Sequence, residues 1–218
     1  MLRESVSYDW FTLSFVLLLI GFVLIKQLYS IKYIQFVKLV FSETYFSDKL
    51  KELRYVTNFE ILIFILSHLV LAQFVYLYIQ KEGIDIGLNL NSFLNVLIVF
   101  IILGLFSTVK YYFEKFVNFS FCNSSFLNYY LFYKLTIWSY AIFLGLPFLI
   151  LEVYAPFSSI NFMNVSLVIM GLFFVISLLV FAYKNLSLIM RHWFYFILYL
   201  CTLEIAPYFF MYKIFAVD

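Results

Sequence analysis

Charged residues are scarce in this sequence. Only 12% of its 218 residues are Asp, Glu, Lys or Arg, whereas 66% are hydrophobic and the mean hydropathy is +1.02. A soluble domain has about 25% charged residues and roughly 45–50% apolar ones. Because so few charges cannot cover a surface in contact with water, the composition excludes a soluble globular protein and predicts a membrane protein. The net charge of +2 gives no reason to expect a nucleic acid as partner.

Cysteine and histidine are also rare, with two of each. Cys122 and Cys201 lie in different segments and form no CxxC pair, which argues against a disulfide framework and against a zinc site. His68 and His192 fall at different expected depths in the membrane, so they cannot hold one haem together. The motifs HExxH, GxSxG and GxxxxGK[ST] do not occur. We therefore predict no cofactor and no metal, and we favour a non-enzymatic role while leaving enzyme activity open.

Long apolar runs make up most of the chain. Six stretches reach the roughly 20 apolar residues that a transmembrane helix needs: 10–29, 57–80, 93–115, 129–151, 163–183 and 193–215. Runs such as FVLLLIGFVLI lack the alternation of a barrel strand, and lipid offers backbone groups no partner outside a helix. The sequence predicts an all-α fold, a polytopic membrane bundle of six transmembrane helices. No linker divides residues 1–218, so we expect a single transmembrane domain.

Lysine and arginine are distributed unevenly between the two sides of these spans. Of the 14 basic residues, only Arg3, Lys81 and Lys213 fall on one side, and all the others fall on the opposite side. Loops rich in Lys and Arg stay in the cytoplasm. The sequence therefore predicts a multi-pass membrane protein with both termini outside the cytoplasm.

The first predicted cytoplasmic loop contains the stretch IKYIQFVKLVF. Ile34, Val37 and Phe41 fall on one stripe of a helix, and Lys32 and Lys38 fall on another. This pattern is typical of an amphipathic interfacial helix, with its lysines near anionic headgroups. The helix could be a docking surface for a partner, or it could simply lie on the membrane.

One acidic residue is expected near the middle of the bilayer. Glu204 lies about 18 Å into the sixth predicted span, and Cys201 and Tyr208 share its face of the helix. His68 has a matching depth in the second span, with Gln73 slightly further along. These five residues form a candidate intramembrane polar centre. Three interpretations stay open: a proton-relay or ion-coupling pair, a polar clamp between two spans, and a protonated Glu204 bonded to a backbone carbonyl.

A second group of polar residues lies near the predicted cytoplasmic interface. Its members are Arg54, Glu60, Glu114, Lys134, Arg191 and His192. Glu114 and Lys134 are expected to reach each other across adjacent spans, and snorkelling explains such side chains without a binding site. Further along, Gly145 and Pro147 are expected to break the fourth span. This break is either a packing kink or an opening around a substrate.

Two segments carry a resemblance to a known family. They are NLSLIMRHWFYFILYLCTLEIAPYFFMYK, residues 185–213, and FYKLTIWSYAIFLGLPFLIL, residues 132–151. With its length and six expected spans, the chain resembles a family of integral inner-membrane proteins of Bacteroidota, a domain of unknown function. The resemblance implies an inner-membrane protein and brings no catalytic residues. It also associates the chain with the secretion and gliding machinery of that phylum, by analogy alone.

We therefore expect a non-enzymatic inner-membrane subunit or scaffold of a larger complex. Its expected partners are the lipid bilayer and either other membrane subunits or further copies of the chain. The first alternative is a proton- or ion-coupled transporter element that uses Glu204 and His68. The second alternative is an enzyme that acts on a lipid-linked substrate at the cytoplasmic interface.

Overall fold

The computed structural model describes residues 9–39, 44–49, 56–81, 92–121, 125–155 and 162–186. These ranges contain seven α-helices and no strands, in agreement with the predicted all-α fold. The helices are α1 (Asp9–Leu28), α2 (Ser30–Val37), α3 (Thr44–Lys49), α4 (Asn58–Lys81), α5 (Ser92–Phe121), α6 (Ser125–Tyr154) and α7 (Phe162–Lys184).

Five of these helices are long and apolar enough to cross a membrane. They are α1, α4, α5, α6 and α7, and they correspond to the first five predicted spans. Helices α5 and α6 have 30 residues each. That is about 45 Å of helix, longer than the roughly 30 Å hydrocarbon core. The sixth predicted span, 193–215, lies outside the described residues. The five helices indicate a membrane protein.

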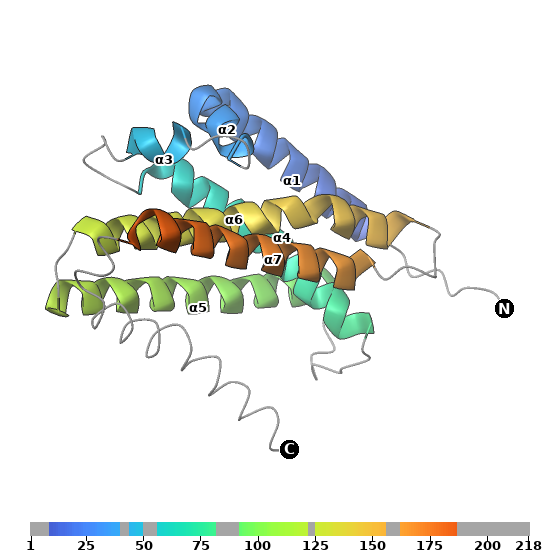
Figure 1. Cartoon of the computed structure of the whole chain (residues 1–218). Helices are drawn as coiled ribbons and strands as arrows, with labels where there is room; N and C mark the ends of the chain where they lie inside the picture. Colours follow the sequence, from blue (N-terminus) through green and yellow to red (C-terminus); the bar gives the residue numbers. More distant parts are fainter. Residues whose placement is uncertain are drawn as a thin grey trace, which may run out of the picture.

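Helices α4 and α6 form the centre of the bundle (Figure 1). Half of the apolar stretch of each is buried, against 6% for α5 and 17% for α7. Helix α6 packs along α7 and α4, α1 packs on α4, and α5 lies against α4 and α6. The outer helices therefore present apolar faces away from the bundle, as expected where lipid is the solvent.

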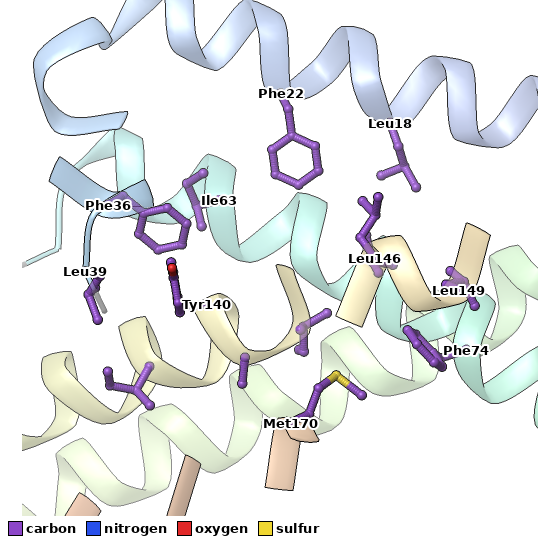
Figure 2. Packing of buried hydrophobic residues seen from close by; sticks show 14 of the residues in the cluster. Leu18, Phe22, Phe36, Leu39, Ile63, Phe74, Tyr140, Leu146, Leu149 and Met170 are labelled. Atoms are coloured by element: carbon purple, nitrogen blue, oxygen red, sulfur yellow. The ribbon is translucent and has the colours of Figure 1, made fainter. Parts of the chain in front are cut away.

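Aromatic and branched side chains fill the space between these helices. Phe22 of α1 meets Phe143 of α6 edge to face, with ring centroids 5.2 Å apart. Figure 2 shows Leu18 and Phe22 of α1 pointing toward the residues of α4 and α6 that complete this core. At the end of the bundle where α1 begins, Thr12 and Tyr154 share a hydrogen bond of 2.6 Å. These contacts hold α1 antiparallel to the central pair.

Helix α6 continues through Gly145 and Pro147, so the predicted break in this span is wrong. Gly145 faces side chains of both α7 and α4. A Cβ atom there would be 2.5 Å from Sδ of Met170 on α7 and 3.2 Å from Phe74 on α4. Close approach of helix backbones at small residues is a common packing device in membranes. The contact supports the packing interpretation of Gly145.

Helix α2 is attached to the bundle by the ring of Phe36 and by a hydrogen bond to its last residue, Val37. Phe36 is 1% exposed and lies edge to face against Tyr140 and Phe143 of α6 and Phe59 of α4. The Tyr140 hydroxyl donates a hydrogen bond of 3.1 Å to the carbonyl oxygen of Val37. The opposite face of α2 is apolar and exposed, formed by Ile31, Ile34 and Val37. The predicted stripe of Ile34 and Val37 is thus exposed on a helix, and Phe41 lies outside the described residues.

Candidate functional site

A buried carboxylate lies at the end of the bundle that carries α2 and α3. Glu60, which is 3% exposed, occupies the first turn of α4. One oxygen, Oε2, accepts hydrogen bonds from the backbone N–H of Thr57, at 2.6 Å, and from the Thr57 hydroxyl. A Glu that reaches back to the residue before the helix is one half of a capping box. The positive end of the helix dipole also favours an acidic side chain in this turn.

The second oxygen of Glu60 connects α4 to the loop helix α3. The hydroxyl of Tyr45 donates to Oε1 over 2.9 Å, and Tyr45 is itself 2% exposed. The next residue, Phe46, packs on Phe132 and Tyr133 of α6, with a centroid distance of 4.5 Å to Tyr133. Glu60 and these aromatic rings therefore fix α3 over the start of α4 and the first half of α6.

A small cavity lies beneath α2 and α3, beside Glu60. It comprises about 190 Å³ of space not filled by atoms, part of which opens outward, and it has room for about one water molecule. Helices α2, α3, α4 and α6 all contribute to its wall, which is lined by Phe36, Tyr45, Phe59, Glu60, Ile63, Leu135, Thr136 and Ser139. Ser139 is 1% exposed, and its hydroxyl has no hydrogen-bond partner among the described residues.

An ion pair joins α5 and α6 in the same half of the bundle. The Lys134 ammonium is 2.7 Å from Oε1 and 2.8 Å from Oε2 of Glu114, and both side chains are largely buried. The ring of Tyr130 lies 5.9 Å from the ammonium nitrogen, within the range of a cation–π contact. The predicted contact between Glu114 and Lys134 is confirmed. Arg54, Arg191 and His192 lie outside the described residues, so the complete polar cluster stays a prediction.

His68 connects α4 to α5 near the middle of both helices. Its Nδ1 atom is 2.9 Å from the carbonyl oxygen of Phe64, and its Nε2 atom is 2.9 Å from the hydroxyl of Ser107. Because a carbonyl oxygen only accepts, Nδ1 donates in this contact, and in the neutral imidazole Nε2 then accepts from the Ser107 hydroxyl. Glu204 lies outside the described residues, and its contact with His68 stays a prediction.

Gln73 connects α4 to α1. Its amide nitrogen donates to the hydroxyl of Ser14, while its oxygen Oε1 is buried without a hydrogen-bond partner among the described residues. Cys201 and Tyr208, the other members of the candidate intramembrane centre, lie outside the described residues. The structure therefore shows two of its five members, His68 and Gln73, each used in a contact between helices.

Comparison with known proteins gives a family. A family model described as a domain of unknown function, DUF4271, matches residues 11–215. The chain belongs to the DUF4271 family. This agrees with the resemblance to a family of unknown function and extends over nearly the whole sequence. No curated protein and no solved structure matched the chain.

The DUF4271 chain also has a polar contact at the end of the bundle opposite α2 and α3. Lys81 of α4 forms an ion pair of 2.9 Å with Oε1 of Glu152 on α6. The other carboxylate oxygen of Glu152 accepts a hydrogen bond of 3.2 Å from the backbone N–H of Met163 in the first turn of α7. Glu152 thus ties the ends of three helices together. No sequence pattern around Glu152 indicates these partners.

Sequence reasoning missed how Glu60 is held in the DUF4271 fold. The stretch TNFE at residues 57–60 precedes an apolar run and matches the sequence signature of a capping box. That signal predicts both the start of α4 at Asn58 and the contact between Glu60 and Thr57. Ser139 carries no comparable signal, because a lone serine in an apolar helix does not reveal whether its hydroxyl has a partner.

Proposed function

We propose that this DUF4271 protein is a non-enzymatic structural subunit of a larger complex in a bacterial inner membrane. One observation carries the proposal: paired polar side chains inside the bundle and at its end connect one helix of the chain to another. The contacts are Glu114 with Lys134, His68 with Ser107, Gln73 with Ser14, and Lys81 with Glu152. Interhelical polar contacts of this kind stabilise helix packing in membranes. A rigid bundle suits a scaffold.

The proposed setting is an inner membrane of the Bacteroidota, with six spans and both termini in the periplasm. The uneven distribution of Lys and Arg in the sequence supports this orientation. It puts α2 at the cytoplasmic face, where the exposed residues Ile31, Ile34 and Val37 would enter the lipid interface. A subunit role in secretion or gliding machinery is proposed by association with that phylum.

Purification from native membranes tests the proposal. A tagged chain expressed from its own promoter is extracted with its surrounding lipid in polymer nanodiscs and analysed by mass spectrometry. We expect another membrane protein, or further copies of this chain, in near-stoichiometric amount. A tagged polytopic protein of unrelated family, purified in parallel, controls for sticky contaminants. Recovery of a monodisperse monomer alone would contradict a subunit role.

A second candidate is a proton- or ion-coupled transporter element that uses Glu204 and His68. It is favoured by Gln73, whose buried Oε1 atom has no hydrogen-bond partner among the described residues. A protonated carboxyl from the sixth predicted span would supply a donor there.

Proton flux into proteoliposomes tests the transporter. Glu204→Gln and His68→Asn should each abolish flux while leaving purification yield and oligomeric state unchanged. Glu152→Gln, which alters a carboxylate at the end of the bundle, is the matched control. Flux that survives both central substitutions would leave these residues with a structural role only.

A further inference from the structure

We propose that the cavity beneath α2 and α3 binds one ordered water molecule that links Ser139 of α6 to Glu60 of α4. The inference does not depend on the proposed function, because it concerns how the first loop is joined to the bundle. It rests on three features: a hydroxyl group without a partner, a cavity of suitable size, and acceptor atoms around it.

The hydroxyl of Ser139 is the first feature. It is buried, and no atom in the part of the chain that the structure describes forms a hydrogen bond with it. Buried polar atoms in native proteins almost always have a partner, either a protein group or an ordered water. The nearby buried hydroxyl of Thr136 follows this rule, because it donates to the carbonyl of Phe132 at 2.9 Å. Ser139 is the exception that needs a ligand.

The cavity provides the space for that ligand. The cavity has room for about one water molecule, and both Ser139 and Glu60 line it. Phe36, Phe59 and Ile63 form apolar walls around it. These apolar side chains leave the polar atoms of Ser139, Thr136, Tyr45 and Glu60 as the hydrogen-bonding groups in the side chains that line the cavity.

The surrounding polar atoms match the hydrogen bonds of one water. A buried water needs 2–4 partners, and about three is typical. In the proposed arrangement, the water oxygen accepts a hydrogen bond from the Ser139 hydroxyl. The water then donates one hydrogen bond to the Glu60 carboxylate and one to Oγ1 of Thr136. Because Glu60 also accepts from Tyr45, the water extends one hydrogen-bonded network from α3 through α4 to α6.

A structure of the full-length protein in nanodiscs, at a resolution that shows ordered waters, tests the site directly. We expect a peak within hydrogen-bonding distance of both Ser139 Oγ and the Glu60 carboxylate. A cavity without such a peak would overturn the proposal.

Thermal unfolding of Ser139→Ala gives a second test. A site that holds the water and a dry site predict changes of the unfolding midpoint in different directions. If the water is present, the substitution removes one of its partners and lowers the unfolding midpoint, by on the order of 2–4 °C. If the site is dry, the substitution removes an unsatisfied hydroxyl and the midpoint stays the same or rises. Ser67→Ala is the matched control, since Ser67 is equally buried but its hydroxyl already donates to the Phe64 carbonyl. A midpoint for Ser139→Ala at or above that of the unchanged protein overturns the proposal, whereas Ser67→Ala shows how far the loss of one buried hydroxyl hydrogen bond lowers the midpoint.

Discussion

At the scale of the residue, the ion pair of Glu114 and Lys134 joins two helices through charges that water barely reaches. Both carboxylate oxygens contact the ammonium, and the two side chains are 3% and 15% exposed. A buried pair of this kind is not necessarily better than two apolar side chains, but removing one partner leaves the other charge in an apolar environment. The pair therefore fixes which faces of α5 and α6 meet.

This asymmetry predicts the result of a double-mutant cycle. Lys134→Met should destabilise the protein by about 3–5 kcal/mol, because Glu114 then loses its bidentate partner. Glu114→Leu combined with Lys134→Met should recover most of that loss. Reversible unfolding in mixed micelles measures each variant. Additive effects of the two substitutions would show that the charges do not interact.

At the scale of the element, the approach of α6 to α7 and α4 depends on Gly145. The same substitution at three glycines separates packing from helix propensity. Gly145→Ala puts a methyl group against Met170 and Phe74 and should cost about 1–3 kcal/mol. Gly104→Ala and Gly171→Ala meet open space and should be neutral or stabilising by up to about 1 kcal/mol.

Unfolding midpoints of the three alanine variants, measured side by side, check this prediction. Met170→Ala should partly rescue Gly145→Ala, because it removes the nearest atom. If all three glycine substitutions behaved alike, the close contact at Gly145 would have no energetic role.

Helices of this chain were predictable to the extent that they depend on local composition. The apolar runs predicted all five described spans within a few residues. Lipid offers no partner to backbone polar groups, so an apolar run long enough to span must form a helix, and length and hydropathy suffice to locate it. Helix α5 extends beyond the predicted span at its C-terminal end and α6 extends beyond it at both ends. The added turns carry polar residues such as Asn118, Asn128 and Glu152. These residues reduce hydropathy without ending a helix.

Contacts between helices were predictable only where opposite charges indicated which two side chains would meet. Glu114 and Lys134 were expected to meet because opposite charges on adjacent spans have few other partners in lipid. Neither the contact of His68 with Ser107 nor the unpaired hydroxyl of Ser139 could be foreseen. Both depend on the rotation of a helix about its axis, which a uniformly apolar sequence does not specify.

At the scale of the whole molecule, the number of spans decides on which side of the membrane the chain ends. Each span reverses the side, so a chain with an external N-terminus ends in the cytoplasm after five spans and outside after six. The five described spans end with α7 at Lys184, and the apolar run 193–215 is predicted to cross once more.

Fusions at two positions test this orientation. Alkaline phosphatase folds only outside the cytoplasm, whereas green fluorescent protein exported by the same route stays dark. A phosphatase fused after Asp218 should be active, and one fused after Leu186 should be inactive because the basic residues there hold the loop inside. Green fluorescent protein at the same two positions should give the reverse pattern. If the fusion after Asp218 behaved like the fusion after Leu186, the run 193–215 would not span, and Glu204 would lose its predicted depth beside His68.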